Sequence, residues 1–280
     1  MRTVVSNGST SKVAVLGAGL MGAAVAAEYL AAGYSVTVTT SARTSPEEAL
    51  ARVREHLAGP AGELTWAGSP EKAAAGARLV VECLPEDAQL KHAHLRAAQQ
   101  VAADALLCTN TSSLPLEALA EALNDPTRLV GTHYLNPPWA FRVVELVIGD
   151  RSDPQVVEEV ESVLRHMGKM PVRVRDVPGF VINRLQFSLL REAINLVEES
   201  IVTPADLDRI VTDGLGRRWS VLGPFATIEL GGPELFRGVA EWLWPRLSCR
   251  HDPPDHWRFL GLSPAELEAM RQERERGLFG

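Results

Sequence analysis

The sequence predicts two domains, an α/β domain with a mostly parallel sheet and then an all-α domain. In the first part, short β-branched runs alternate with helical stretches, as they do where crossover helices join parallel strands. From Phe180 onward the apolar residues recur at helical spacing. We place the boundary at the turn Asp176-Val177-Pro178-Gly179, which gives domains over residues 12–176 and 177–280.

The first element is a strand that leads through a glycine turn into a helix. Lys12 to Leu16 (KVAVL) runs into GAGLMG at residues 17–22, and an alanine-rich helical stretch follows. In this order Gly17 permits the tight turn, Gly19 lets the backbone approach a pyrophosphate, and Gly22 lets helix and strand pack closely. The N-terminal N–H groups of the helix would face the phosphates. The motif predicts a Rossmann-type dinucleotide-binding domain more strongly than a loop that merely turns.

The second strand, Tyr34 to Thr40 (YSVTVTT), ends without an acid. In NAD-binding domains this end normally carries the carboxylate that hydrogen-bonds the adenosine ribose. Here Thr40 and Ser41 supply hydroxyls, and Arg43 follows. An arginine can pair bidentately with a 2′-phosphate, and no carboxylate repels it, so we predict NADP in preference to NAD. The alternative is that Arg43 is a solvated residue before the helix near Pro46 to Leu57.

Polar residues follow the next two predicted strands. Arg78 to Leu84 is followed by Pro85-Glu86-Asp87 and by a helix with Lys91 in its early turns, and Ala105 to Thr109 opens into Asn110-Thr111-Ser112-Ser113. In open α/β sheets, ligands bind at the carboxyl ends of the strands. The competing interpretation of the second cluster is an N-cap for the following helix.

A lone histidine and a lone glutamate occupy the next two strand-like segments. His133 lies near the end of Arg128 to Tyr134, Glu145 lies within the apolar run Val143 to Ile148, and Asn136-Pro137-Pro138 forces a break between the two segments. If the segments lie side by side, the carboxylate can orient the imidazole and raise its basicity, as a proton-shuttling histidine requires. On spacing alone, a surface histidine that never meets the glutamate is an equally good interpretation.

The last part of the chain is predicted to be helical. Pro171 to Arg175 is a final strand, and long helical stretches then cover Phe180 to Ile201 and Glu234 to Leu247, with Thr203-Pro204 beginning another helix. An aromatic-rich helical domain is more often used for packing and subunit contact than for a cofactor. Because these helices offer more apolar surface than one such domain can bury, we predict a homodimer joined through them.

The bulk composition is that of a globular enzyme or binding protein. The 280 residues are 46% hydrophobic, and a net charge of −7 arises from 28 basic and 35 acidic residues without long single-sign blocks, so no nucleic-acid partner is indicated. No apolar run approaches the roughly 20 residues that span a bilayer, and Met1 to Ser11 lacks a signal peptide's apolar core. Because Cys83, Cys108 and Cys249 lack metal-ligand spacing, we expect no metal site and a reducing cytoplasm.

Several motifs together resemble the 3-hydroxyacyl-CoA dehydrogenase superfamily: GAGLMG, VVECLPED, NTSSL, GTHYLNPP with VVELV, and PGFVINRLQ. The second half, from PGFVINRLQ to WSVLGP, is most similar to the lambda-crystallin and L-gulonate 3-dehydrogenase branch. That branch handles free 3-hydroxy acids rather than only acyl thioesters. The segment Pro46 to Glu71 is shorter than the helical pair that helps to clasp CoA in acyl-CoA relatives, which weakens a CoA-dependent interpretation.

The resemblance implies roles for matched residues. His133 is implied as the catalytic acid/base, Glu145 as its orienting partner, and Ser112 and Asn183 as polar contacts to the reacting oxygen of the substrate. Three positions match residues around the nicotinamide and its ribose, namely Glu86, Lys91 and Asn110. Together with the glycine turn after the first strand and the polar residues at the end of the second, these positions complete the set of expected cofactor-binding residues. The set is Gly17, Gly19, Leu20, Met21, Gly22, Thr40, Ser41, Arg43, Glu86, Lys91 and Asn110.

Arg218 is a further candidate for substrate binding. It lies in GLGRRW, residues 214–219, which we expect to be a glycine-flanked loop, and it matches an arginine of the gulonate-like branch. A guanidinium group can hold a substrate carboxylate through two parallel hydrogen bonds, which a thioester cannot accept in the same way. The alternatives are an exposed loop arginine and an interdomain salt bridge.

We therefore expect an NAD(P)-dependent oxidoreductase, of class EC 1.1.1.-, that interconverts a small 3-hydroxy acid and its 3-keto form. His133 would take the hydroxyl proton as hydride leaves the adjacent carbon, and return it in reduction. An alternative keeps this chemistry but presents the substrate as a thioester, on CoA or a carrier protein, in a biosynthetic pathway. A third interpretation is a non-catalytic crystallin-like protein, against which the complete set His133, Glu145, Ser112 and Asn183 argues.

Overall fold

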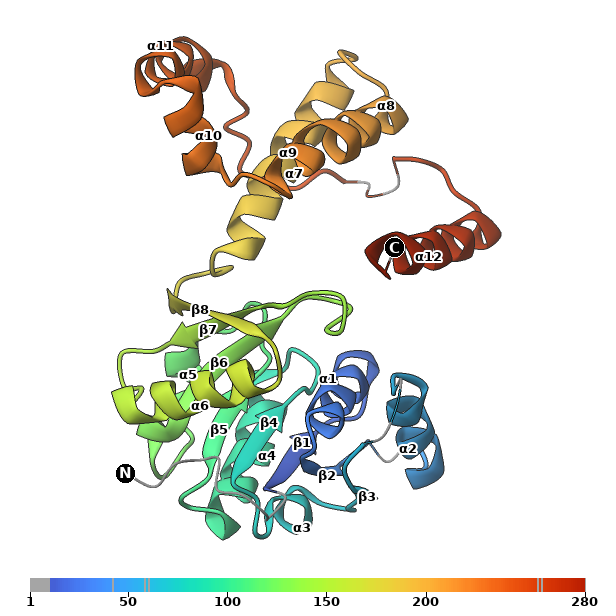
Figure 1. The fold of residues 1–280 in the computed structure, drawn as a ribbon, viewed down its shortest axis with the longest axis vertical. Coiled ribbons are helices and arrows are strands. Elements are labelled where there is room, and N and C mark those ends of the chain that lie inside the picture. Colours follow the sequence, from blue (N-terminus) through green and yellow to red (C-terminus); the bar gives the residue numbers. More distant parts are fainter. Residues whose placement is uncertain are drawn as a thin grey trace. The chain divides into compact units, whose positions relative to one another are not determined.

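The computed structural model describes residues 11–41, 43–57, 59, 61–255, 257 and 259–279. The chain forms two compact units, of which the first ends at Asn183 and the second begins at Arg184. The first unit extends past the boundary predicted after Asp176, because the Phe180 side chain is packed into its hydrophobic core. Figure 1 shows helices on both sides of a sheet in the first unit and helices alone in the second.

The described part of the first unit contains an eight-stranded sheet with the order β3-β2-β1-β4-β5-β6-β7-β8. Strands β1 to β6 pair in parallel, β7 runs antiparallel to β6, and β8 is parallel to β7. The chain order reverses between β1 and β4, and doubly wound sheets bind ligands at such a crevice. The strands are β1 (Lys12–Leu16), β2 (Ser35–Val38), β3 (Leu64–Trp66), β4 (Leu79–Glu82), β5 (Leu106–Thr109), β6 (Leu129–Tyr134), β7 (Val143–Ile148) and β8 (Met170–Arg175).

Two hydrophobic layers cover the sheet because successive strand side chains point to opposite faces. Val13 and Val15 of β1 pack in one layer, and Ala14 and Leu16 pack in the other. The first layer includes side chains of α1 (Leu20–Ala31), α2 (Pro46–Glu55) and α6 (Pro154–His166). The second includes side chains of α3 (Pro70–Ala74), α4 (Ala88–Val101) and α5 (Leu116–Ala120).

Helix α1 begins differently from the helices around it. Ser45, Ser69, Asp87 and Asp153 each accept a backbone N–H at the start of α2, α3, α4 and α6, respectively. By contrast, α1 begins after Gly19 with no side-chain cap and no acid in its first turn. Its first N–H groups are therefore available to an anion.

Most predicted strands and helices of the first unit are present, with ends shifted by a few residues. The strand β3 was not predicted, because three residues are too few to display a period. Between β2 and β3 the described residues form one helix, α2, which agrees with the short segment noted in the sequence. A 3₁₀ turn, η1 (Pro126–Arg128), precedes β6.

The second unit contains helices and turns. The predicted cap Thr203 and first helical residue Pro204 are found at the start of α8. The helix predicted from Phe180 starts later, at Ile182, because Gly179 and Phe180 have positive φ angles of 75° and 49°. The elements are α7 (Ile182–Glu198), α8 (Pro204–Arg209), the π-helix η2 (Ile210–Gly216), α9 (Arg217–Trp219), α10 (Pro224–Gly231), α11 (Pro233–Leu243), the 3₁₀ turn η3 (Trp244–Arg246) and α12 (Pro264–Phe279).

The segment GLGRRW is helical, so the prediction of a loop around Arg218 was wrong. Its glycines lie in η2, and Arg218 lies in α9. A Cβ at Gly216 would meet the Val211 carbonyl oxygen at 3.0 Å, so a glycine suits the wider π-helical turn. Glycine here allows close backbone approach rather than ending the helix.

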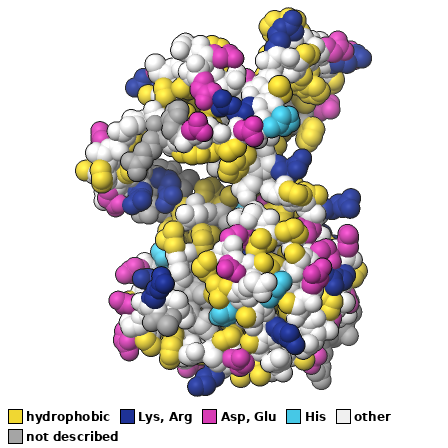
Figure 2. All heavy atoms as spheres, turned by 180° about the vertical axis from the view of Figure 1, so that it is seen from behind, with side chains coloured by type: hydrophobic (Ala, Val, Ile, Leu, Met, Phe, Trp, Pro, Cys, Tyr) yellow, Lys and Arg dark blue, Asp and Glu magenta, His cyan; other side chains and the backbone are white. Residues whose placement is uncertain are grey.

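Large apolar side chains remain exposed on the second unit. Among its described hydrophobic residues, only Ile194 is buried. On the face drawn in Figure 2, hydrophobic side chains reach the surface of both units, and basic side chains are scattered among acidic ones. None of the described helices is long and apolar enough to cross a membrane. Seven exposed large hydrophobic side chains belong to α10, α11 and η3, namely Phe225, Leu230, Leu235, Val239, Trp242, Leu243 and Trp244.

Candidate active site

The glycine turn after β1 has the shape of a phosphate cradle. Gly17 has a φ of 101°, and a Cβ there would lie 2.9 Å from the carbonyl oxygen of Cys83. A Cβ at Gly22 would lie 1.8 Å from the carbonyl oxygen of Gly17. At Gly19, in contrast, a Cβ would meet nothing within 4 Å. The first and third glycines are therefore required by close packing, while the second leaves space before the uncapped start of α1, which fits a dinucleotide pyrophosphate.

A cleft of about 520 Å³ lies at the carboxyl ends of β1, β4, β5 and β6. It coincides with the crevice where the strand order reverses. Gly17, Gly22, Lys91 and Glu145 are not among its lining residues, and neither are the residues after β2 or Arg218. Eight predicted site residues line it, namely Gly19, Leu20, Met21, Glu86, Asn110, Ser112, His133 and Asn183.

His133 and Glu145 form a buried hydrogen-bonded pair. The antiparallel register of β6 and β7 sets the two residues opposite each other. His133 Nδ1 lies 2.7 Å from Glu145 Oε2, and the two residues are 7% and 2% exposed. The Phe180 ring packs against the imidazole with ring centroids 5.5 Å apart. Nδ1 is thus engaged by Glu145 and His133 lines the cleft, so the interpretation of a surface histidine that never meets the glutamate is excluded.

Glu145 is held as a carboxylate. Its second oxygen accepts the N–H groups of Val181 and Ile182 at 2.8 and 2.9 Å. Burial raises the pKa of the Glu145 carboxyl, but the hydrogen bonds from His133, Ile182 and Val181 outweigh burial, so its pKa lies below the ordinary value. Glu145 therefore presents a negative charge to the His133 imidazole.

Ser112 and Asn183 meet at the cleft. The Asn183 side-chain amide donates to the Ser112 carbonyl oxygen at 3.2 Å. Asn183 lies near the start of α7 and belongs to the first compact unit with Ser112 and His133. The three residues therefore line one cleft within one unit.

Glu86 is an ionised acceptor at the cleft wall. It accepts the Thr111 hydroxyl at 2.6 Å and the N–H groups of Ser112 and Ser113 at 2.8 and 3.0 Å. Burial raises the pKa of Glu86, but the Thr111 hydrogen bond and the nearby Lys91 ammonium lower it to about 2 overall. Such a carboxylate can accept hydroxyl groups of a ribose.

Lys91, predicted to lie near the nicotinamide and its ribose, is buried and is not among the residues that line the cleft. Its side chain is 1% exposed, and its ammonium pairs with Glu82 at 2.8 Å and with Glu86 at 3.1 Å. The buried Glu82 carboxylate and the part-exposed Glu86 carboxylate hold the ammonium inside the protein, away from solvent. Sequence reasoning missed Glu82, although an acid in the apolar run Arg78 to Leu84 was a signal, since a charge in a buried strand needs a partner.

The end of β2 carries hydroxyls and no carboxylate. The Thr39 hydroxyl accepts the N–H of Gly17 at 3.1 Å, which ties this end of β2 to the glycine turn. Thr40 is half-buried, whereas Ser41 and Arg43 are exposed. Hydroxyls and a guanidinium thus follow β2 beside the glycine turn, outside the residues that line the cleft.

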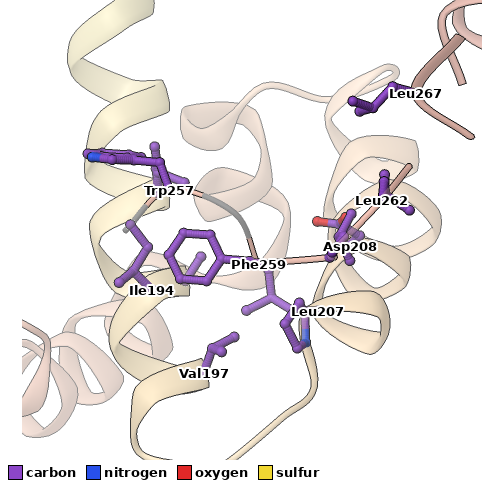
Figure 3. Close-up of a pocket in the computed structure, with 13 residues that line it drawn as sticks. Ile194, Val197, Leu207, Asp208, Trp257, Phe259, Leu262 and Leu267 are labelled. Atoms are coloured by element: carbon purple, nitrogen blue, oxygen red, sulfur yellow. The ribbon is translucent and has the colours of Figure 1, made fainter. Parts of the chain in front are cut away.

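The second unit has a separate cavity of about 400 Å³ (Figure 3). It is lined by residues of α7, α8 and the chain between Trp257 and Leu267, with Asp208 as the charged residue among its described lining. None of the predicted catalytic or cofactor-binding residues lines it. Arg218 is exposed elsewhere on this unit. Among the described residues, no group of three or more His, Cys, Asp or Glu side chains could hold a metal ion.

The fold, the glycine turn and the buried acid/base pair define a dehydrogenase that uses a nicotinamide dinucleotide. Residues 12–177 match the NAD binding domain of 3-hydroxyacyl-CoA dehydrogenase, and residues 179–253 match its C-terminal domain. The chain therefore belongs to the 3-hydroxyacyl-CoA dehydrogenase family and is an NAD-dependent dehydrogenase of class EC 1.1.1.-.

Curated relatives and solved structures agree with this family. L-Carnitine dehydrogenase of Streptomyces griseus is 36% identical over 241 residues, 80% of this chain and 70% of the relative. A lambda-crystallin homolog of Bos taurus is 33% identical over 236 residues, 78% of this chain and 73% of the relative. A crystal structure of 5-formyl-3-hydroxy-2-methylpyridine 4-carboxylic acid 5-dehydrogenase, described as an NAD+ dependent dismutase, has a TM-score of 0.89 at 29% identity and covers 96% of both chains. The predicted resemblance to the superfamily and to lambda-crystallin is confirmed.

Proposed function

We propose that the protein interconverts a small, free 3-hydroxy acid and its 3-keto form with a nicotinamide dinucleotide. The buried pair of His133 and Glu145 supports this function most directly, because its free imidazole nitrogen belongs to the cleft that begins at the glycine turn. A histidine oriented by a carboxylate can transfer the hydroxyl proton near neutral pH.

In the oxidation direction, His133 Nε2 takes the hydroxyl proton of the substrate while the C–H hydride leaves. The bound nicotinamide supplies the hydride acceptor. Glu145 keeps Nδ1 protonated and stabilises the imidazolium, so that the oxygen can become a carbonyl as the proton departs. Ser112 and Asn183 orient this oxygen toward His133. In reduction, the imidazolium returns the proton to the carbonyl oxygen.

Two observations support a free acid in place of a thioester. The segment between β2 and β3 holds one helix of 10 residues, α2, which offers little to clasp CoA. The relative L-carnitine dehydrogenase is named for a free 3-hydroxy acid. We therefore propose that Arg218 pairs with the substrate carboxylate through its guanidinium group, in the same chain or in a partner subunit.

A second candidate function is the oxidation and reduction of an aldehyde. The structure with a TM-score of 0.89 is described as a dismutase, and its name contains a formyl group. His133 would take a proton from the hydrated aldehyde as hydride leaves, which yields the acid. A second aldehyde would accept the hydride and a proton, which yields the alcohol.

The functions are separated by turnover at 340 nm with free 3-hydroxy acids, their CoA thioesters and aromatic aldehydes, each with NAD and NADP. We expect the free acids to be the best substrates and Arg218→Met to raise the KM for an acid far more than for its amide. Faster turnover of the thioester, or an equal effect of Arg218→Met on acid and amide, would contradict the free-acid proposal. Aldehyde turnover that yields acid and alcohol in equal amounts would support the second candidate.

We propose NADP as the preferred cofactor on the basis of Thr40, Ser41 and Arg43. Hydroxyls and a guanidinium suit a 2′-phosphate, and hydrogen bonds to charged groups contribute roughly 1.5–3 kcal/mol, about a ten- to hundredfold preference. The structural relative described as NAD+ dependent supports the opposite choice. Thr40→Asp should shift the ratio of kcat/KM toward NAD. A native enzyme equally efficient with NAD would show that Arg43 does not contact the cofactor.

A further inference from the structure

Glu82, at the end of β4, is a fully buried carboxylate that does not line the cleft. Its two oxygens accept hydrogen bonds from the Lys91 ammonium at 2.8 and 3.0 Å. One of these oxygens also accepts the Thr109 hydroxyl at 2.6 Å. Lys91 reaches onward to Glu86 Oε2 at 3.1 Å and to the Leu84 carbonyl oxygen at 3.1 Å. One buried ammonium thus bridges two carboxylates.

This network joins the two loops that carry cleft residues. Glu86 lies in the loop after β4 and holds the loop after β5 through Thr111 and Ser112. Thr109, at the end of β5, binds Glu82 and accepts the Thr111 N–H at 3.2 Å. The N–H of Asn110 donates to the main-chain carbonyl oxygen of Glu82 at 2.8 Å, and its side-chain oxygen accepts the Tyr134 N–H at 3.0 Å, so Asn110 is held independently of the Glu82 carboxylate. Fixing the Glu82 carboxylate therefore fixes Glu86, through Lys91, against the loop after β5.

Protein oxygens engage the N–H donors of Lys91 in this structure. An ammonium has three N–H donors, and four oxygens from Glu82, Glu86 and Leu84 already surround it. A buried ion pair is costly to desolvate, and well-packed hydrophobic residues often stabilise a fold equally well. Stability alone therefore does not explain why such a network occupies this position. A need to hold the cleft residues in a fixed geometry does.

We propose that Glu82 and Lys91 are positioning residues for the cofactor, acting through the Glu86 carboxylate. Glu86 lines the cleft, where its carboxylate can accept ribose hydroxyls. Without Lys91, two carboxylates would face each other, and Glu86 would move away or take up a proton. The inference rests on the proposed function only in requiring that the cleft binds a nicotinamide dinucleotide.

The test measures the Kd of NADH or NADPH, whichever the native protein binds more tightly, by protein fluorescence without substrate. We expect Glu82→Gln and Lys91→Met each to raise this Kd roughly tenfold, the effect of losing a hydrogen bond to a charged group. The double variant Glu82→Gln/Lys91→Met buries fewer unpaired charges than Lys91→Met, so its Tm should recover, while its Kd should stay high. Recovery of both quantities would mean that the network is only structural, and would overturn the proposal.

Two further variants make the outcome specific. Gln99 is also buried in α4, but it is not among the cleft residues. Its side chain hydrogen-bonds the backbone of Asn124 and Asp125. Gln99→Leu should lower the Tm and leave the Kd unchanged. In a Glu86→Gln background, Glu82→Gln should raise the Kd no further, because the group that it positions is already altered. An additive effect would contradict action through Glu86. Native protein that binds neither dinucleotide would instead refute the proposed function.

Discussion

At the scale of single residues, the hydrogen bond between His133 and Glu145 is the central contact of the proposed site. His133 and Glu145 come from neighbouring strands, and the second carboxylate oxygen of Glu145 accepts backbone N–H groups at the start of α7. The imidazole therefore cannot rotate without breaking its hydrogen bond to Glu145 of β7 and its packing on Phe180. Such restraint suits proton transfer, which depends on the position of the nitrogen as much as on its pKa.

Replacing the two residues should separate chemistry from binding. General acid–base catalysis contributes on the order of 10² to 10⁴ in rate, so His133→Ala should lower kcat by that factor and leave the cofactor Kd nearly unchanged. Glu145→Gln should lower kcat less, because the imidazole keeps a hydrogen-bond acceptor but loses the charge. Steady-state kinetics and fluorescence titration provide the two quantities. Wild-type turnover in the histidine variant would refute the mechanism.

Acid should destabilise the protein partly through Glu86. Its pKa is lowered from 4.5 to about 2 in the folded chain, so ionised Glu86 favours folding above pH 4.5, and this contribution is lost as the pH falls toward 2. Urea unfolding at pH 6, 5, 4 and 3 should show a smaller loss of unfolding free energy for Glu86→Gln than for the native chain. Equal slopes would mean that the carboxyl is not stabilised in the folded state.

At the scale of elements, the N-terminal ends of two helices differ in the polar groups that they bind. The start of α1 is left without a cap, where a phosphate is expected, and the N–H groups at the start of α7 donate to Glu145. Lys169, just before β8, joins further elements: it pairs with Glu28 of α1 and donates to the carbonyl oxygens of Pro138 and Phe141 at 2.7 and 3.3 Å. The loop between β6 and β7 is thereby tied to α1.

Lys169→Met should destabilise the first unit. Lys169 is 7% exposed, and its loss leaves the Glu28 carboxylate and two carbonyl oxygens without their shared donor. Breaking a buried ion pair costs about 3–5 kcal/mol, and the part-exposed Glu28 places the expected loss near the lower end, at ~3 kcal/mol. Urea unfolding monitored by circular dichroism measures it. Lys72→Met, in the exposed last turn of α3, is the control and should change stability by less than ~0.5 kcal/mol.

At the scale of the whole molecule, we propose that the chain forms a homodimer through its helical unit. The support is its exposed apolar surface, in which Phe225 and Trp244 are 81% and 72% exposed. Isolated domains rarely leave contiguous apolar surface of this kind uncovered, and two-fold dimers are the commonest assembly. A second copy of this chain would cover side chains that a single copy leaves in water.

Light scattering at micromolar concentration should give twice the chain mass of 30.4 kDa. A pair of charges at the proposed contact, Leu235→Glu with Trp242→Glu, should shift the protein toward the monomer, because burying unpaired charge is costly. Arg271→Glu, on the exposed part of α12, controls for charge alone. A native mass near that of one chain would exclude the dimer.

The sequence by itself determined the α/β class, the glycine turn and the order of most elements, because these depend on local spacing: glycines at residues 17, 19 and 22, alternation along strands and caps at helix starts. Only the tertiary structure decided which polar residues meet. The contact between His133 and Glu145 depends on strand register, the place of Asn183 depends on Phe180 packing into the first unit, and the burial of Lys91 depends on Glu82 across the β4–α4 turn. These contacts are made by side chains that local spacing does not bring together, so periodicity cannot reveal them.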